Sequence, residues 1–290
     1  MDLPIVVGVD GSEMSLRAVD WAADEAELRG APLRIVYASL WERYEGALLA
    51  QETGRPLEEV MARDVVGTAE QRAQRRRPGV KVTTGVLPSE PDQGLIQESG
   101  TALAVVVGSR GRGEVAEVLL GSVSLTVAGH AHCPVIVVRG THDSTARPVS
   151  RRPVVLGVGD RPAGTAAVRF AVEEAALRGV PLDAVRAWRR PAQVTTRHAL
   201  LAGEPEPLRQ QQAAELLEDA LRDVPPDLEV RRRTVEGHAR DALGAASREA
   251  DLLVLGTRRR RAPLGPRLGR TAHAVLHHAE CPVAVVPEPP

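Results

Sequence analysis

The sequence repeats itself at long range, and this repeat limits the chain to folds built from two similar units. The segment Pro4-Ile5-Val6-Val7-Gly8-Val9 returns as Pro153-Val154-Val155-Leu156-Gly157-Val158, at an offset of 149 residues. Closer to the end of each copy, Cys133-Pro134-Val135 returns as Cys281-Pro282-Val283, at an offset of 148 residues. Repeats of this size are typical of a duplicated domain.

Two copies of ordinary domain size account for the 290 residues of the chain. We expect a first domain at residues 1–140 and a second domain at residues 153–290. The segment between them, 141–152, is rich in Ser, Thr, Arg and Pro and is therefore the expected linker.

Short apolar runs alternate with segments of helical period in both copies. In the first copy the expected strands are 5–9, 33–37, 80–86, 103–107 and 135–138, and the expected helices are one that ends near Gly30, then 57–77, 94–99 and 123–130. Strands that are continuously apolar and separated by helices indicate a parallel sheet covered on both faces. The pattern therefore predicts an α/β fold with two tandem, open, parallel five-stranded sheets flanked by helices. In such sheets ligands bind beyond the carboxyl ends of the strands, at the switch point.

A glycine pattern follows the fourth apolar run of the first copy. Gly108-Ser109-Arg110-Gly111 is followed by nine residues and then by Gly121-Ser122. Glycines let backbone N–H groups approach an anion closely, and a helix that begins at Val123 turns its positive end toward the same place. The pattern therefore indicates a phosphate-binding loop between a strand and a helix.

The order of strand, G-x2-G-x9-G-S and helix resembles the nucleotide-binding motif of the universal stress protein family. The resemblance covers nearly the whole chain and extends to the duplication, as in tandem members of that family. It implies Rossmann-like domains of the adenine-nucleotide alpha-hydrolase type, which form a pseudo-twofold pair through their last strands at 135–138 and 283–286. It also implies ATP as the ligand, while the sequence leaves open whether Mg²⁺ accompanies the phosphates.

The resemblance assigns binding residues position by position. Asp10 stands where the family has a carboxylate that contacts the ribose or the adenine, with Gly8 in the same segment, and Val36 stands where main-chain groups meet the adenine edge. The residues expected at the phosphates are Gly108, Gly111, Gly121, Ser122 and the amide of Val123, with Arg110 and Arg112 to neutralise charge. Two separate alternatives stay open. One is that Asp10 serves only to hold the following turn, and the other is that Arg110 and Arg112 are solvated loop residues.

The second copy departs from the family pattern. Arg259 stands at the position of the inner glycine, Arg270 at the position of the serine, and Gly159 at the position of Asp10, with the carboxylate displaced to Asp160. We therefore expect the second copy to bind ATP weakly or not at all. The cations expected there, Arg258 to Arg261, Arg267 and Arg270, form either a rim that holds a different anion or a solvated loop.

Other classes of nucleotide enzyme do not fit the sequence. The glycine spacing of 108–113 matches a P-loop, but Glu114 occupies the position of the phosphate-binding lysine, and the kinase signatures are missing. The histidines His273, His277 and His278 have no recognisable partners that would complete a metal site. We expect neither catalytic residues nor metal ligands.

Composition argues against two further kinds of partner. The net charge of −1 gives no bulk attraction to nucleic acid or to membrane surfaces, and no apolar stretch is long enough to cross a bilayer. The cytoplasm is therefore the expected compartment.

These inferences lead to a functional expectation with one alternative. We expect an ATP-binding protein that acts as a sensor or regulator in the stress response, with slow ATP hydrolysis at most, a further homodimer of whole chains and a protein partner that the sequence does not identify. The alternative is an interaction scaffold without a ligand, in which the glycines serve only as turn residues.

Overall fold

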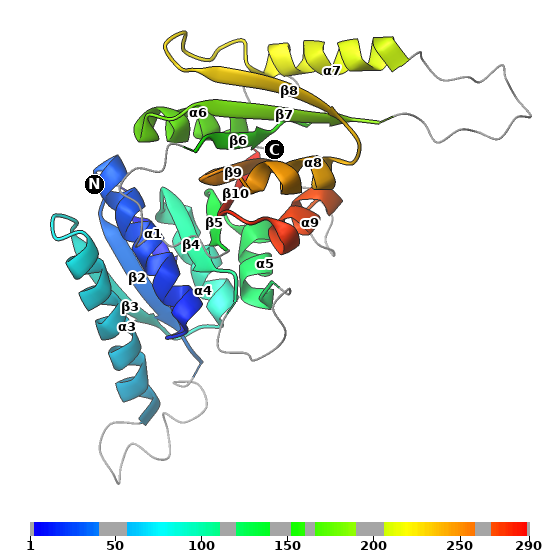
Figure 1. Cartoon of the computed structure of the whole chain (residues 1–290). Helices are drawn as coiled ribbons and strands as arrows, with labels where there is room; N and C mark the ends of the chain where they lie inside the picture. The colour runs from blue at the N-terminus through cyan, green and yellow to red at the C-terminus, as the bar shows by residue number, and fades with distance from the viewer. Residues whose placement is uncertain are drawn as a thin grey trace, which may run out of the picture.

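The computed structural model describes residues 3–40, 57–110, 120–139, 152–159, 166–189, 206–258 and 268–288. Figure 1 draws these residues as a ribbon and the remainder as a thin grey trace. The expected linker at 141–152 lies almost entirely outside the described residues, so the proposed domain boundaries stay a prediction.

Within the described residues, each half contains five strands that alternate with helices, as the apolar runs predict. The first half contains β1 (Ile5–Gly8), α1 (Glu13–Arg29), β2 (Leu33–Ala38), α3 (Leu57–Arg76), β3 (Val82–Leu87), α4 (Pro91–Glu98), the 3-10 helix η1 (Ser99–Thr101), β4 (Ala104–Gly108), α5 (Ser122–His130) and β5 (Val135–Val138). The second half contains β6 (Val154–Gly157), α6 (Ala166–Arg178), β7 (Leu182–Trp188), α7 (Glu206–Ala220), β8 (Val230–Glu236), α8 (Ala239–Ser247), β9 (Leu252–Arg258), α9 (Arg270–His278) and β10 (Val283–Glu288). Helix α4 begins three residues before the predicted start at Gly94, because Pro91 is well suited to the first position of a helix.

The strands join in one ten-stranded sheet, in the order β3-β2-β1-β4-β5-β10-β9-β6-β7-β8 (Figure 1). Strand pairing is parallel within each half, and the two halves meet where β5 pairs antiparallel with β10. In this seam Ile136 lies opposite Ala284. The predicted pairing of the two last strands is therefore confirmed, and it removes two sheet edges from solvent.

Both faces of the sheet are buried under helices. In β1, Ile5 and Val7 belong to the core under α1, α3, α6 and α7, whereas Val6 belongs to the core under α4, α5, α8 and α9. All three side chains are 0% exposed. The two-residue period of a strand thus divides one apolar run between two cores, which explains why the run is continuous.

Local signals fix the ends of α1. The side-chain oxygen of Ser12 accepts a hydrogen bond from the Ser15 N–H at 3.2 Å and so caps the first turn. The helix ends at Gly30, which has a φ of 62°, a left-handed conformation that glycine adopts without strain. Gly179, at the equivalent position of the repeat, has the same φ of 62° after α6.

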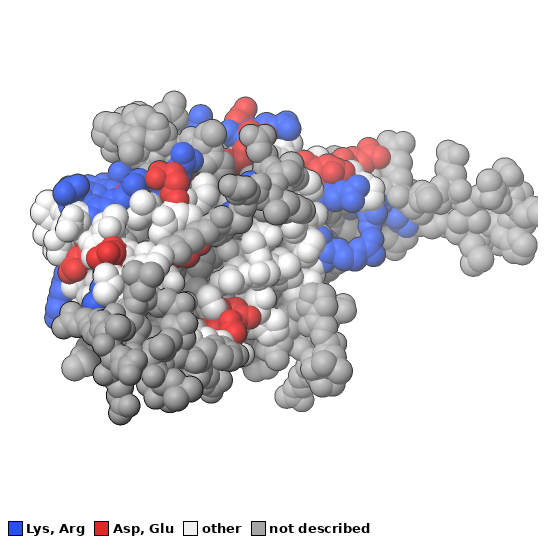
Figure 2. Space-filling view, turned by 90° about the horizontal axis from the view of Figure 1, so that it is seen from below, with Lys and Arg blue, Asp and Glu red and all other residues white. Residues whose placement is uncertain are grey.

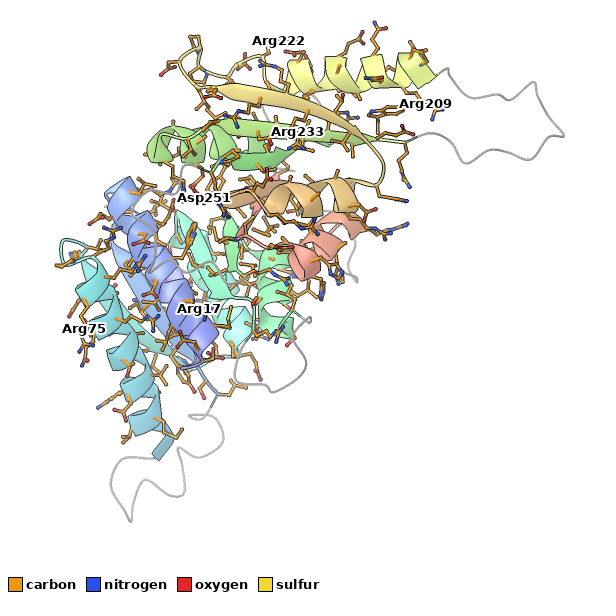
Figure 3. The ribbon with its side chains drawn as sticks, viewed as in Figure 1. Arg17, Arg75, Arg209, Arg222, Arg233 and Asp251 are labelled. Carbon is orange, nitrogen blue, oxygen red and sulfur yellow. The ribbon has the colours of Figure 1, made fainter. Side chains whose placement is uncertain are left out.

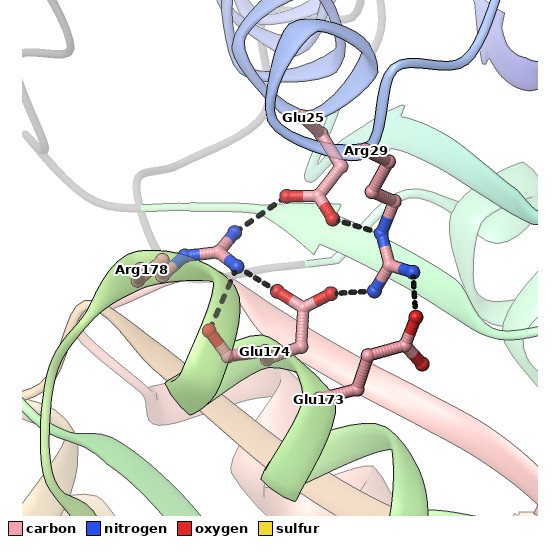
Figure 4. A network of polar contacts seen from close by, with 5 residues as sticks. All are labelled: Glu25, Arg29, Glu173, Glu174 and Arg178. Atoms are coloured by element: carbon pink, nitrogen blue, oxygen red, sulfur yellow. Dashed lines mark hydrogen bonds and ion pairs between the residues drawn. The ribbon is translucent and has the colours of Figure 1, made fainter.

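Two glutamates and two arginines form a buried ring between α1 and α6, which we call the charge ring (Figure 4). Arg29 donates through Nε to Glu25 and through Nη2 to Glu174; Arg178 donates through Nη1 to Glu174 and through Nη2 to Glu25, the last at 2.5 Å. Each residue has its repeat partner in the ring, which therefore follows the pseudo-twofold symmetry. Glu25 is 2% exposed and Glu174 is 0% exposed, so the two guanidinium groups take the place of water around both carboxyl groups.

Aromatic rings and one exposed carboxylate complete the surroundings of the charge ring. The Arg29 guanidinium lies 5.4 Å from the centre of the Phe170 ring, and that of Arg178 lies 5.8 Å from the centre of the Trp21 ring. Trp21 and Phe170 are repeat equivalents, so the cation–π contacts also obey the symmetry. Arg29 additionally donates to Glu173 at 2.8 Å.

The two carboxyl groups of the charge ring differ in proton affinity. Burial and the facing carboxylate of Glu25 raise the pKa of Glu174 to about 8. Burial also acts to raise the pKa of Glu25, but Arg178, a hydrogen bond from Glu174 and Arg29 together lower it below its ordinary value. A proton shared by the pair therefore resides on Glu174.

We expect this proton to make stability depend on pH. Folded Glu174 keeps its proton up to a pH of about 8, whereas an unfolded glutamate releases it near 4.5, so this contribution is fully present below about pH 4.5 and is lost as the pH rises through 8. The variant Glu174→Gln cannot titrate at this position and therefore lacks this pH-dependent contribution to stability. The free energy of unfolding of the wild type should fall relative to that variant, by at most about 1.4 kcal/mol for each pH unit between about pH 5 and pH 8.

Urea unfolding followed by circular dichroism at several pH values measures this difference. Glu173→Gln is the control, because the Glu173 side chain is 56% exposed and should show no such trend. A constant difference between the wild type and Glu174→Gln across this pH range contradicts the prediction.

Helix α1 approaches β4 closely at Gly108. A Cβ atom on Gly108 would lie 2.8 Å from the carbonyl oxygen of Met14 and 2.9 Å from its carbonyl carbon. Both are backbone atoms in the first turn of α1, so they cannot move without displacing the helix. Gly108 therefore has a packing role, whatever ligand its loop binds.

We expect Gly108→Ala to lower the free energy of unfolding by about 1–3 kcal/mol, because the added methyl group overpacks this contact. The control is Gly67→Ala in α3, where a Cβ meets no atom within 4 Å. That change should be neutral or stabilising by up to about 1 kcal/mol, since alanine favours a helix. Denaturant titration of both variants tests the contrast, and equal effects would refute it.

Candidate functional site

The predicted binding residues gather at the carboxyl ends of β1 and β4. Strand β1 lies between β2 and β4. The connection after β1 leads to β2 and the connection after β4 leads to β5, toward opposite edges of the sheet, so this is the switch point. Gly8 and Asp10 come from the end of β1, Val36 from β2, Gly108 and Arg110 from the end of β4, and Gly121, Ser122 and Val123 from the start of α5. Gly111 and Arg112 lie outside the described residues.

Asp10 forms the turn between β1 and α1. Its Oδ1 accepts hydrogen bonds from the Ser12 N–H at 3.0 Å and from the Ser12 hydroxyl at 2.6 Å. Gly11, between them, has a φ of 82°. The Oδ2 atom of Asp10 accepts no hydrogen bond from the described residues, so the carboxylate keeps a free acceptor while its Oδ1 holds the turn.

Gly8 and Val36 have structural roles at this edge. A Cβ on Gly8 would lie 2.8 Å from a methyl carbon of Leu95, so the glycine makes room for that side chain. Val36 is 1% exposed, and its carbonyl accepts the Val9 N–H at 2.9 Å within the sheet. A base at this edge would therefore share the Val36 carbonyl with Val9.

The two described ends of the glycine loop are tied together. The Gly121 N–H donates to the Ser109 carbonyl at 2.8 Å, and the Ser124 hydroxyl donates to the Gly108 carbonyl at 2.7 Å. Ser124 is 5% exposed. Ser124 was not predicted from the sequence, because Ser122 and Thr126 in the same helix carry hydroxyls too and nothing in the sequence distinguishes Ser124 from them.

The first turn of α5 is open to an anion. Gly121 is the N-cap residue, contributes no side-chain acceptor, and is followed by a turn without an acidic residue. Ser122 is exposed and Val123 is half-buried. Among the described residues no side chain caps the backbone N–H groups of this turn, which favours negative charge at this end of the helix.

Two arginines make this end of the sheet positive. Arg110 is half-buried at the start of the loop. Arg139, which follows β5, donates through Nη2 to the His277 carbonyl at 2.7 Å, while its Nε and Nη1 are buried and have no hydrogen-bond partner among the described residues. Burial and the nearby charge of Arg110 lower the pKa of Arg139. The sequence analysis missed Arg139, because only the seam with the second half buries it.

The equivalent place in the second half carries the opposite charge. Gly159 stands at the position of Asp10, and Arg186 of β7 donates through Nη1 to the Gly159 carbonyl and, at 3.4 Å, to that of Val158. Arg186 is 7% exposed. Asp160 and residues 259–267, which hold Arg259 and most of the expected cationic rim, lie outside the described residues.

The cysteines and histidines do not form a reactive cluster among the described residues. Burial raises the pKa of Cys133 and of Cys281 to about 12, so both remain thiols that fill space. The rings of His273 and His277 lie 4.6 Å apart, but the described residues contain no group of three or more His, Cys, Asp or Glu side chains that could hold a metal ion. No described helix is both long and apolar enough to cross a membrane.

Comparison with known proteins agrees with the geometry. The model of the universal stress protein family matches residues 3–139 and 150–287. A universal stress protein of Mycobacterium tuberculosis is 33% identical over 301 residues, which cover 97% of this chain and 96% of that protein.

Among solved structures, a universal stress protein from Archaeoglobus fulgidus covers 98% of both chains with a TM-score of 0.65 and 16% identity, and so shares the fold. A universal stress protein solved in complex with cAMP covers 48% of this chain and 97% of its own, with 27% identity and a TM-score of 0.38. The double match to the family model and the full-length relative show that this chain belongs to the universal stress protein family.

Proposed function

We propose that the first half of the chain binds ATP and that the protein acts as a nucleotide-dependent sensor or regulator in the stress response. The observation that carries this proposal is the open first turn of α5 beside Arg110 and Arg139. Backbone donors at a helix start together with guanidinium groups suit a chain of phosphates. Family membership and the glycine motif support the same ligand.

The nucleoside part of ATP would lie toward β1. The Oδ2 atom of Asp10 is an acceptor for a ribose hydroxyl, and Asp10 is fixed in place by its two bonds to Ser12. Since the described residues offer no metal-binding cluster, we propose that Mg²⁺ enters on the phosphates themselves.

A regulatory role is supported by contacts between the loop and the second half. The Leu120 N–H, next to Gly121, points to Nδ1 of His277 in α9 at 3.5 Å, and Arg139 holds the carbonyl of the same histidine. A change in the loop on binding ATP would therefore reach α9 directly. We propose little or no turnover, because this signal needs only a bound nucleotide.

A ligand-free scaffold is the second candidate, and specific contacts favour it. Asp10 holds a turn, Gly8 makes room for Leu95, and Gly108 makes room for Met14, so each has a reason to be present without a ligand. Experiments must therefore separate binding from packing.

We expect Ser122→Asp to distinguish ATP binding from a purely structural role of this loop. A carboxylate in the first turn of α5 should stabilise the helix by about 0.3–1 kcal/mol and yet weaken ATP binding at least about tenfold by repulsion of the phosphates. Equilibrium dialysis with labelled ATP measures binding, and urea unfolding measures stability. Ser122→Asn is the uncharged control and should bind ATP nearly as well as the wild type.

Asp10→Asn tests the ribose contact. Its side-chain oxygen can still accept both bonds from Ser12, so the turn and the stability should change little. The second carboxylate oxygen becomes an amide donor, so ATP binding should weaken about tenfold. If the wild type binds no ATP, or if neither Ser122→Asp nor Asp10→Asn weakens binding, the scaffold is the better account.

A further inference from the structure

The second half contains a large cavity at the carboxyl ends of β6 and β7, between α7, α8 and α9. Its volume is about 860 Å³, which is ample for a small molecule. Among the described residues, its charged lining comprises one carboxylate, Glu288, and five arginines: Arg186, Arg189, Arg209, Arg240 and Arg270. In Figure 2, Lys and Arg side chains gather on the right-hand part of the surface, at the end of the molecule where Figure 1 places the ends of β7 and α7.

Glu288, the carboxylate among the described lining residues, is already engaged by backbone donors. Glu288 accepts the N–H groups of Ala166 and Ala167 at 2.8 Å and 3.2 Å, and so caps the start of α6. Its charge is thus compensated by backbone donors and by the positive end of a helix. The arginines therefore dominate the electrostatic potential in the cavity.

The arginines are organised by contacts with their neighbours. Arg209 of α7 donates to the Arg189 carbonyl at 3.3 Å, and an Arg189 nitrogen lies 3.1 Å from Nδ1 of His238, the N-cap residue of α8. The Nε atom of Arg209 is buried and has no hydrogen-bond partner in the described part of the chain. The guanidinium of Arg186 is held at the end of β6 by the Gly159 carbonyl. Several donors with fixed positions thus surround one space.

A phosphate matches this space better than a nucleoside does. In the first half the end of β1 offers the acceptor Asp10, whereas the end of β6 offers Arg186, whose guanidinium has only donors. A ribose hydroxyl can accept as well as donate, so Arg186 does not exclude it, but a phosphate has only acceptor oxygens and is the group that several guanidinium donors match best. Arginine also matches phosphate oxygens in a bidentate geometry.

We propose that this cavity binds a compact anion with two or more phosphate groups, which it recognises without a nucleoside. The site is separate from the ATP site proposed above and does not depend on it. Trp188 also lines the cavity, and a comparison with ATP tests whether a base adds to binding.

The test uses the full-length chain carrying Ser122→Asp, in which phosphate binding at the first site should be weakened at least about tenfold. Isothermal titration calorimetry with sodium tripolyphosphate at near-physiological salt should show one binding event. Arg186→Met should weaken it about tenfold or more, and Arg209→Gln about threefold or more. Arg222→Gln is the matched control: Figure 3 places Arg209 and Arg222 at opposite ends of α7, and the Arg222 side chain is 70% exposed.

Each result decides for or against the proposal. The absence of binding overturns it, and so does binding that Arg209→Gln leaves unchanged, because the proposal makes the Arg209 guanidinium a donor to the anion. Thermal unfolding of Arg209→Gln checks that the variant is folded. Equal losses from Arg209→Gln and Arg222→Gln would indicate general surface charge and would also overturn it. ATP bound about tenfold more tightly than tripolyphosphate would show that the nucleoside is recognised. Thermal unfolding of Arg186→Met checks that its loss of binding is not a loss of folding.

Discussion

The contact between the two halves controls the rest of the structure. The antiparallel pairing of β5 with β10 joins two parallel sheets, and the charge ring closes the same seam between α1 and α6. Each guanidinium in the ring binds one carboxylate from its own half and one from the other half. Truncating one side chain of the ring in the folded chain would leave its buried partners without full compensation, which is far more costly than the net value of an intact ion pair. The halves are therefore bound to fold as one body.

This seam also determines what surrounds the candidate site. It brings α9 against the loop of the first half, where His277 receives the side chain of Arg139 and lies next to Leu120. By the same symmetry, Leu268 of the second half packs on Gly129 in α5, 3.6 Å from the position of a Cβ atom there. The loop that carries the glycine motif is thus supported by its own half and by the other.

The fold could be predicted from the sequence because buried parallel strands are visible as apolar runs and because the repeat provides an internal check. The pairing of the last strands followed from the family resemblance. The site was predictable only in part: Gly108 and Asp10 are found at the switch point, but both also have local packing or turn roles. Arg139, Arg186 and the charge ring could not be predicted, since each depends on a partner more than 25 residues away that only the tertiary fold brings near.

The difference between Asp10 and the pair Gly159–Arg186 has a consequence for how such a protein can diverge. A symmetric dimer of a single repeat must carry two identical sites, because one gene encodes both, and any substitution appears twice. Here the two repeats share one chain, so an acceptor can be kept in one half while a donor replaces it in the other. Every molecule then carries one end of each kind in a fixed ratio. Covalent duplication thus allows the two halves to differ in charge without the need for a second gene or for selective assembly of unlike subunits.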